Sequence, residues 1–300
     1  MKFSAESMMR QMEENGFVFS STQQMSKGKY LSFDAEWNYK DMPHLHEIHE
    51  LTEAVQGAIE DDYVASVLIQ KVGPFTVPLT MFTCAISRFE NFHFSSFGPY
   101  VVLIRTKWST EINCTTVFTD YFLGSKRFLK WSHHYVHRLL AQNYRVLMAK
   151  DVPMRMRRGQ LRSKNYGFVG DAIGYGFLDS MNLVKFGVVN PYDLAPCSWS
   201  SPIDAISQGT TLVGSSDSSG VRLVRQNDVL QVFPRICMHA GASLDLARIE
   251  NSCVACPWHG KLIRPIITIS LAEGARSCES KGIKIEIKDS IVFVTGAYEV

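Results

Sequence analysis

The sequence predicts an α+β chain, in which a curved antiparallel sheet wraps on one long helix and a small all-β domain follows. Segments rich in β-branched and aromatic residues recur between residues 64 and 122, as expected for strands. Residues 126–150 then show apolar positions every three to four residues, which is typical of a helix. Past residue 190 the chain changes to short strand patterns between turn residues. Two domains of different construction are therefore expected.

The first domain takes its sheet from four predicted strands, at residues 64–70, 82–89, 100–105 and 114–122. The long helix is expected to lay an amphipathic face on this sheet. The apolar positions of that face are Phe128, Trp131, Tyr135, Leu139, Leu140, Tyr144 and Leu147. The helix is expected to end near Asp151, because Val152 directly precedes Pro153 and is biased away from the α conformation.

A change in composition marks the boundary between the domains. Residues 186–220 are rich in Pro, Ser and Gly and lack a helical period, so the boundary is placed just before Pro191. The domains are thus predicted to be residues 1–190 and 191–300. The second domain has four predicted short strands, at residues 221–224, 229–233, 284–287 and 291–294.

Composition restricts the kinds of partner. Three hundred residues, 46% of them hydrophobic, suffice for two domains with apolar cores. A net charge of +2 indicates neither a nucleic-acid nor a membrane partner. No apolar run approaches the roughly 18 residues that a membrane-spanning helix needs, and the polar N-terminal segment is unlike a signal peptide. A soluble, cytoplasmic protein is expected, in which cysteines that hold no metal are free thiols.

Four metal-ligand residues lie in two short segments of the second domain. Cys237 and His239 belong to C-M-H, and Cys256 and His259 belong to C-P-W-H-G, after sixteen intervening residues. Two thiolates and two imidazoles are the ligands of a Rieske [2Fe-2S] cluster. A zinc ion is the alternative, and Cys253 adds a C-x-x-C pair with Cys256. The spacing favours the cluster, because zinc sites usually use C-x-x-C knuckles or H-x3-5-H pairs.

A second group of ligand side chains lies in residues 36–49. Its members include Asn38, Asp41, His44, His46 and His49. Two His and one carboxylate on one face of an iron leave positions open for O2 and a substrate. His44 and His49 are five residues apart, about 140° around an ideal helix, and converge only if the helix is distorted or begins there. Spacing alone favours His46 with His49, or His133 with His137.

The two cluster segments resemble the cluster loops of Rieske proteins of the low-potential oxygenase and ferredoxin type. In addition, Asn38-x2-Asp41-x2-His44-x4-His49 is similar to the N-x2-3-D-x2-H-x4-H iron motif of Rieske ring-hydroxylating oxygenases that consist of alpha subunits only. The resemblance implies that His44, His49 and Asp151 hold a mononuclear Fe(II), since the family's third ligand is an Asp at the end of the long helix. It also implies a helix-grip (START-like) fold for residues 1–190. The domain order is reversed, because the Rieske domain of the family comes first.

The same resemblance implies the other parts of the activity. Asp41 would accept hydrogen bonds from an iron ligand and from a cluster His of a neighbouring subunit, and Asn38 would lie beside the iron. Electrons from NAD(P)H would arrive through a separate reductase or ferredoxin. A closed homotrimer would pass them from the cluster of one subunit to the iron of the next. A small organic substrate would be hydroxylated, demethylated or otherwise oxidised with O2, by monooxygenase or dioxygenase chemistry.

The substrate pocket is expected on the sheet and to be largely apolar or aromatic, because alternate strand residues face inward. The candidate lining residues are Phe82, Cys84, Phe94, Phe97, Tyr100, Val102, Val117 and Phe118. A basic run after Asp151 indicates either a solvated face or a docking surface for an acidic ferredoxin or reductase. The run consists of Arg155, Arg157, Arg158, Arg162 and Lys164.

Two other classes of protein remain open on the sequence. One is a non-catalytic Rieske electron-transfer protein fused to a ligand-binding domain, which would lack the mononuclear iron. The other is a structural protein that binds zinc. The iron content distinguishes them, because the oxygenase requires three Fe per chain, the electron carrier two and the zinc protein none.

Overall fold

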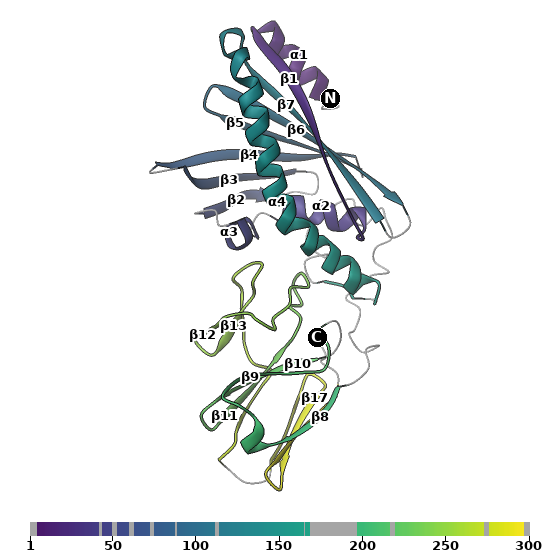
Figure 1. Cartoon of the computed structure of the whole chain (residues 1–300), viewed down its shortest axis with the longest axis vertical. Helices are drawn as coiled ribbons and strands as arrows, with labels where there is room; N and C mark the ends of the chain where they lie inside the picture. Colours follow the sequence, from purple (N-terminus) through teal and green to yellow (C-terminus); the bar gives the residue numbers. More distant parts are fainter. Residues whose placement is uncertain are drawn as a thin grey trace. The chain divides into compact units, whose positions relative to one another are not determined.

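The computed structural model describes residues 5–41, 44–49, 53–59, 63–72, 75–87, 89–111, 114–164, 166–168, 197–216, 220–272 and 276–296. They form two compact units, one with the described residues up to Gln160 and one that begins at Leu161 (Figure 1). The predicted boundary at residues 190 and 191 lies outside the described residues. Leu161, Tyr166 and Phe168, which the predicted first domain includes, instead pack with Ile236 inside the second unit.

The first unit is built on a seven-stranded antiparallel sheet of order β1-β7-β6-β5-β4-β3-β2. Its strands are β1 (Phe17–Gly28), β2 (Glu53–Ile59), β3 (Tyr63–Val72), β4 (Phe75–Ser87), β5 (Glu90–Phe97), β6 (Tyr100–Glu111) and β7 (Cys114–Lys126). The four predicted strands correspond to β3, β4, β6 and β7. The sequence analysis missed β1, β2 and β5. Polar residues dominate much of β1, and it becomes a strand by pairing along its whole length with β7.

Helices cover both faces of this sheet. They are α1 (Ala5–Glu14), α2 (Ser32–Lys40), α3 (His44–His49) and α4 (His133–Arg162), with a 3-10 helix, η1 (Arg127–Ser132), before α4. On one face, Tyr144 of α4 packs with Val102 and Tyr121. On the opposite face, Met8 of α1 packs near Leu103. Figure 1 shows α4 crossing the sheet diagonally. A long helix gripped by an antiparallel sheet is the helix-grip arrangement.

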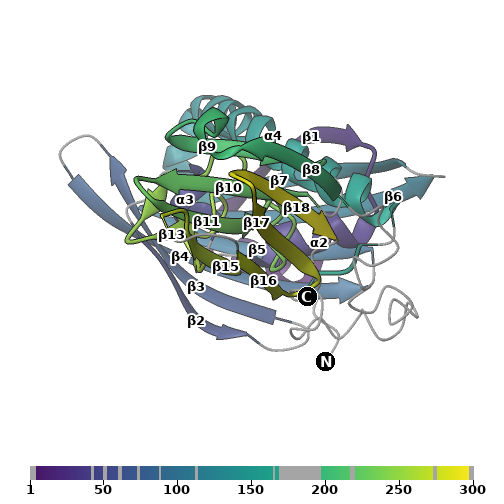
Figure 2. The same cartoon turned by 90° about the horizontal axis from the view of Figure 1, so that it is seen from below.

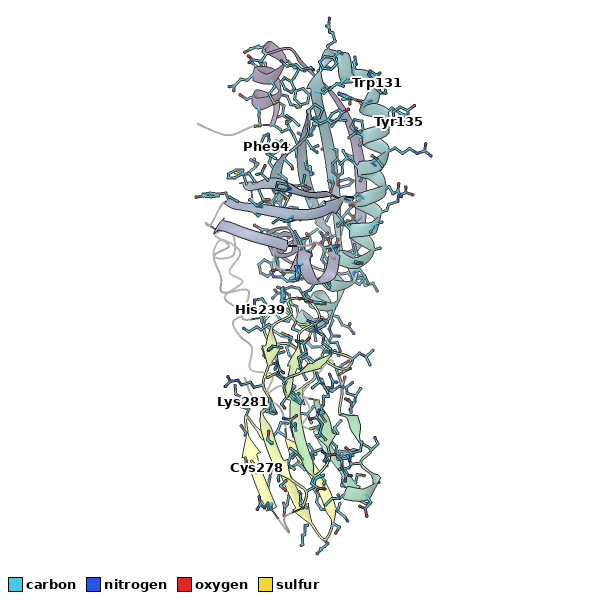
Figure 3. The ribbon with its side chains drawn as sticks, turned by 90° about the vertical axis from the view of Figure 1, so that its left-hand side faces the viewer. Phe94, Trp131, Tyr135, His239, Cys278 and Lys281 are labelled. Carbon is cyan, nitrogen blue, oxygen red and sulfur yellow. The ribbon has the colours of Figure 1, made fainter. Side chains whose placement is uncertain are left out.

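The predicted apolar face of the long helix is only partly right. Leu140 and Tyr144 do pack on the sheet, together with Val136 and Met148. The predicted positions that are instead 61–75% exposed are Phe128, Trp131, Tyr135 and Leu139. Figure 3 shows Trp131 and Tyr135 projecting away from the sheet. The segment carries apolar residues on two faces, and periodicity alone does not decide which face the sheet covers.

The predicted helix end at Asp151 is wrong, because α4 continues through Pro153 to Arg162. A proline inside a helix costs about 3 kcal/mol, through one lost hydrogen bond and a steric clash. Buried contacts beyond Pro153 offset this cost. Arg155 donates two hydrogen bonds to Asn38, and Arg158 forms an ion pair of 2.9 Å with Asp34.

These contacts also correct the interpretation of the basic run. Arg155, Arg158 and Arg162 are buried rather than solvated. The guanidinium of Arg158 lies 4.0 Å from the ring centroid of Trp37, and Asp34 balances its charge. Three of the five basic side chains are therefore buried in the interior, where they cannot contact an acidic protein.

The second unit contains two four-stranded sheets and one small three-stranded sheet. Their orders are β15-β11-β10-β9, β16-β17-β18-β8 and β12-β13-β14. The strands are β8 (Cys197–Pro202), β9 (Gly209–Val213), β10 (Val221–Gln226), β11 (Val229–Pro234), β12 (Ile249–Glu250), β13 (Cys253–Ala255), β14 (Leu262–Ile263), β15 (Ile267–Ser270), β16 (Arg276–Ser280), β17 (Ile283–Lys288) and β18 (Ile291–Gly296). The four predicted strands, now β10, β11, β17 and β18, are confirmed.

One apolar core joins the two larger sheets of the second unit. Leu223 and Val232 come from the first sheet, Ile285 and Val294 come from the second, and all four are fully buried. Figure 2 shows β8, β18, β17 and β16 side by side. Within the described ranges of the whole chain, no helix is long and apolar enough to span a lipid bilayer.

Candidate metal centres

Two similar loops carry the four predicted cluster ligands. Cys237 and His239 follow β11, whereas Cys256 and His259 lie between β13 and β14. In each loop the Cys carbonyl accepts a hydrogen bond of 2.8 Å from a glycine four residues later. Gly241 and Gly260 have φ of 93° and 63°, a conformation that glycine adopts without steric cost. The chain therefore turns back tightly at both sites.

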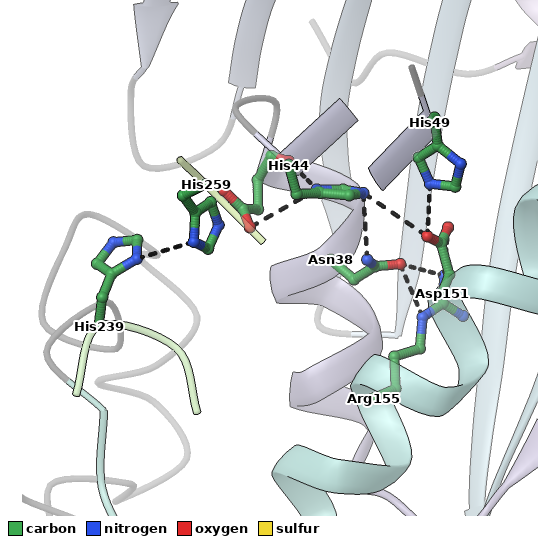
Figure 4. A network of polar contacts seen from close by, with 8 residues as sticks. Asn38, His44, His49, Asp151, Arg155, His239 and His259 are labelled. Atoms are coloured by element: carbon green, nitrogen blue, oxygen red, sulfur yellow. Dashed lines mark hydrogen bonds and ion pairs between the residues drawn. The ribbon is translucent and has the colours of Figure 1, made fainter. Parts of the chain in front are cut away.

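The four side chains of these loops converge in pairs. The Nδ1 atoms of His239 and His259 lie 3.3 Å apart (Figure 4). Cys237 and Cys256 are buried, and their sulfur atoms form a hydrogen bond that lowers the pKa of Cys237 to about 7. The same contact and burial raise the pKa of Cys256. Paired sulfurs and paired imidazole nitrogens fit the two irons of a Rieske cluster, one with Cys ligands and one with His ligands.

Charged side chains stabilise the first cluster loop from beneath. Arg235 donates two hydrogen bonds of 2.7 Å to the carboxylate of Asp245. Arg222 donates to the main-chain oxygens of Leu244 and Ala247. Bidentate and charge-assisted bonds of this kind are stronger than neutral ones. They hold the backbone on both sides of the loop in place.

The second candidate centre lies in the first unit. The ligand atoms of His44, His49 and Asp151 all lie within 4.8 Å of one another. The Nε2 atoms of His44 and His49 lie 3.7 and 2.7 Å from the same oxygen, Oδ1 of Asp151. Both histidines come from α3 and the carboxylate comes from α4, as Figure 4 shows. Of the three His pairs that the sequence left open, the structure brings His44 and His49 together.

Surrounding groups prepare His44 to bind a metal. Its Nδ1 donates a hydrogen bond to the main-chain oxygen of Asp41, which leaves the lone pair of Nε2 directed at Asp151 and His49. Burial lowers the pKa of His44, but the carboxylates of Asp151 and Asp41 outweigh this effect and raise it to about 9. The environment thus favours a positive charge at Nε2, which either a proton or a metal ion supplies.

The three side chains are close enough to share one metal ion. Metal–ligand bonds of about 2.1 Å place neighbouring ligand atoms about 3 Å apart, between the two distances measured to Asp151. Burial raises the pKa of Asp151, yet the hydrogen bonds to His44 and His49 and the Arg155 charge together lower it below its usual range. Asp151 is therefore an anion, as a metal ligand must be.

Asn38 joins this triad to a buried cation. Its amide nitrogen lies 3.4 Å from Nε2 of His44, and its oxygen accepts bonds of 2.8 and 2.6 Å from Arg155. Arg155 also lies 3.9 Å from the Asp151 carboxylate. The sequence analysis missed this role of Arg155, although its position four residues after Asp151 places both on one helix face.

The other candidate residues have different surroundings. His46 is exposed. His133 and His137 both hydrogen-bond to Ser20 of β1 at 2.7 Å, so they connect α4 to the sheet. Asp41 is buried, and its carboxylate lies 3.6 Å from His44.

Four of the eight predicted pocket residues lie on the face of the sheet opposite to α4. Phe82 pairs with Phe94 and Phe94 pairs with Leu103, on the face that α1 covers. Cys84 lies two positions from Phe82 along β4 and therefore shares its face. Phe118 pairs with the residue four positions from Leu103 along β6, so it lies on the same face. Tyr100, Val102 and Val117 face α4, and the side chain of Phe97 lies outside the described part of the chain. Phe82 and Phe94 do line an open pocket of about 330 Å³, away from the triad's face.

Comparison with known proteins identifies part of the chain. Residues 201–264 match the family model of the Rieske [2Fe-2S] domain, and this range contains all four cluster ligands. The chain therefore contains a Rieske [2Fe-2S] domain, preceded by a helix-grip domain. No curated protein matches the chain.

Solved structures similar to this chain cover its helix-grip part. TTHA0849 from Thermus thermophilus is 14% identical over 45% of this chain and 95% of its own, with a TM-score of 0.38. The di-domain aromatase/cyclase StfQ of the steffimycin pathway is 8% identical over 51% and 55%, with a TM-score of 0.43. The Zhui aromatase/cyclase from Streptomyces sp. R1128 is 9% identical over 47% and 96%, with a TM-score of 0.41. Similarities this low carry no inference about activity.

Proposed function

We propose that this protein is a Rieske-type oxygenase that oxidises a small organic substrate with O2. The observation that carries the proposal is the convergence of His44, His49 and Asp151 in a chain that also contains a Rieske domain. Two imidazoles and one carboxylate are the ligand set of non-heme Fe(II) oxygenases. When bound there, the iron would supply O2 activation driven by electrons from the cluster.

The residues of the chain have separate tasks in this proposal. Cys237, Cys256, His239 and His259 hold the cluster. Asp41 fixes the tautomer of His44 through its main-chain oxygen, and Asn38 bridges the imidazole and Arg155. Arg155 stabilises the Asp151 carboxylate as an anion. The triad thus keeps its geometry before metal and substrate bind.

Electron supply and assembly follow from the family resemblance. A separate reductase or ferredoxin, fed by NAD(P)H, would reduce the cluster, and a homotrimer would pass electrons between subunits with Asp41 at the junction. A reducing compartment such as the cytoplasm suits the protein, because none of its seven cysteines forms a disulfide. Light scattering of the purified protein tests the trimer.

A non-catalytic electron carrier is the competing function. The bond of 2.7 Å between His49 and Asp151 favours it to some degree, because this contact satisfies both groups without a metal. In that case the helix-grip domain would bind a ligand and the cluster alone would be redox-active.

Iron analysis of anaerobically purified protein separates the two functions. The oxygenase requires three Fe per chain and the carrier two. His44→Ala is expected to lower the content from three to two and to abolish turnover, while the visible spectrum of the cluster stays the same. His46→Ala, on the same helix but exposed, should keep all three. Two Fe in the wild type, after reconstitution with Fe(II), would exclude the oxygenase.

A further inference from the structure

Polar side chains form a row across the sheet face that α4 covers. Asn91 pairs with Thr106 across β5 and β6, and Thr106 pairs with Thr119 across β6 and β7. All three are 0–2% exposed, and neither the amide of Asn91 nor the hydroxyl of Thr106 has a hydrogen-bond partner within the described structure. Apolar residues border the row on both sides, with Val117 at one side and Tyr121 at the other. The polar row therefore lies between two apolar parts of this face.

The helices direct more unpaired polar atoms at the same region. The buried hydroxyl of Tyr39 also lacks a partner among the described residues, and those of Tyr30 and Tyr144 have none there at normal hydrogen-bond distance, although they lie near Arg155 and Thr119. Tyr39 comes from α2 and Tyr144 from α4, and Tyr30 precedes α2. Tyr144 interacts with Thr119, which places the phenols at the polar row.

Arg155 connects this cluster to the proposed iron centre. Its guanidinium is fully buried and lies 4.7 Å from the ring centroid of Tyr39 and 5.9 Å from that of Tyr30. Nε and Nη2 both donate to Asn38, but Nη1 has no partner in the described structure. The Nη1 group of Arg155 is therefore available near the phenols. Only Asn38 separates the guanidinium from His44.

Such a concentration of unpaired groups needs an explanation. Native proteins leave few buried polar atoms unpaired, because each one destabilises the fold. A site that must hydrogen-bond a ligand keeps such atoms, and it then rejects ligands that lack the matching groups. A buried guanidinium selects an anion, and a carboxylate supplies one that accepts a charge-assisted hydrogen bond.

We infer that this cluster is the substrate site and that the substrate is a small organic carboxylate. Arg155 binds its carboxylate through Nη1, and the phenols of Tyr30, Tyr39 and Tyr144 hydrogen-bond the carboxylate or a second oxygen of the substrate. The inference rests on the proposed oxygenase function and replaces the expected apolar pocket with a polar one. The open pocket at Phe82 and Phe94 belongs to the other sheet face.

Calorimetric titration of anaerobic holoprotein tests this substrate class. The probes are benzoate, 4-hydroxybenzoate and hexanoate, each compared with its primary amide. At least one acid is expected to bind ten-fold or more tightly than its amide. Arg155→Gln should remove this preference, whereas Arg155→Lys, which keeps the charge, should retain part of it.

Phenol variants test the site without disturbing the buried charge. Tyr144→Phe removes a hydroxyl that has no partner at normal hydrogen-bond distance, so the melting temperature should stay the same or rise, while affinity for the preferred acid falls several-fold. Tyr135→Phe, on the exposed face of the same helix, should change neither quantity. A purely structural role of Tyr144 predicts the opposite, a lower melting temperature with unchanged affinity.

Three outcomes would overturn the inference. The first is equal binding of acids and their amides, and the second is no binding of any acid. The third is unchanged acid affinity of the Tyr144→Phe variant, which would indicate that the polar cluster holds only water. Iron content keeps this test separate from the proposed function. Three Fe per chain without acid preference would contradict only the substrate class, whereas acid preference with two Fe per chain would contradict only the oxygenase.

Discussion

Nε2 of His49 lies 2.7 Å from Oδ1 of Asp151, although 102 residues separate them in the chain. The whole seven-stranded sheet apart from β1 is formed by the residues between them. Asp151 is fixed because α4 continues for three turns beyond it, anchored by Arg155 and Arg158. The position of the third ligand thus depends on contacts that lie after it in the sequence.

Asp151→Asn should remove the mononuclear iron and spare the cluster. The amide keeps the shape of the side chain but loses the anion that a divalent metal needs. Iron content should fall from three toward two per chain, and Fe(II) affinity in a chelator competition should drop at least ten-fold. Asp120→Asn, which changes an ion pair with Arg105 on the sheet, should keep three irons. Equal iron content in the two variants would speak against Asp151 as a ligand.

Breaking the Asp34–Arg158 pair should strongly destabilise the first unit. Both side chains are fully buried, so Asp34→Asn leaves the Arg158 charge without its counter-ion. Removal of one partner of a buried ion pair typically lowers the free energy of unfolding by about 3–5 kcal/mol. Urea unfolding followed by helix circular dichroism measures this loss. Lys27→Ala breaks a solvated pair with Glu111 and should cost less than about 1 kcal/mol. Similar losses of unfolding free energy in both variants would contradict the expectation that the buried pair contributes more to stability than the exposed pair.

His93 should make stability depend on pH below neutrality. The ring is buried on β5, accepts or donates a bond of 2.8 Å with Thr83, and lies 5.4 Å from the ring of Tyr39. Burial lowers its pKa from 6.5 to about 4. Below about pH 6.5 the unfolded chain therefore binds a proton that the folded chain does not, and above it this residue adds no dependence on pH.

The expected loss approaches about 1.4 kcal/mol per pH unit as the pH falls from 6.5 toward 4. Urea unfolding at pH 7, 6 and 5 measures it, since His93→Asn should flatten the slope relative to the wild type. His134→Asn, at an exposed position of α4, should leave the slope unchanged. If wild type and His93→Asn show parallel curves, the imidazole takes up its proton in the folded state.

Gly241→Ala should disrupt the first cluster loop. The residue has φ of 93°, and an added Cβ would lie 2.7 Å from the ring of Phe168 and 3.0 Å from Leu161. Loss of cluster absorbance on purification and a lower melting temperature are expected. Gly209→Ala has a similar φ of 104° but open space around the added carbon. It should cost about 1–2 kcal/mol through backbone strain alone and keep the cluster. Full cluster occupancy in Gly241→Ala would mean that Phe168 moves aside easily.

The residue types and local spacings of both candidate metal centres can be read from the sequence alone. Cys237, His239, Cys256 and His259 lie in two short loops whose geometry depends on nearby residues, such as the glycines at 241 and 260. Four strands of the second unit, β10, β11, β17 and β18, also followed from local alternation and turn residues. These features are local, so sequence pattern suffices to predict them.

The tertiary structure was needed to show which face of each helix and strand contacts its neighbours. Helical period could not show that Trp131 and Tyr135 face away from the sheet, because both faces of that helix carry apolar residues. Nor could it show that Arg155 is buried beside Asn38, since a basic run is normally solvated. The convergence of His44, His49 and Asp151, and the polar row at Asn91, Thr106 and Thr119, depend on strand register and helix position. These are set by long-range contacts, which a local pattern does not contain.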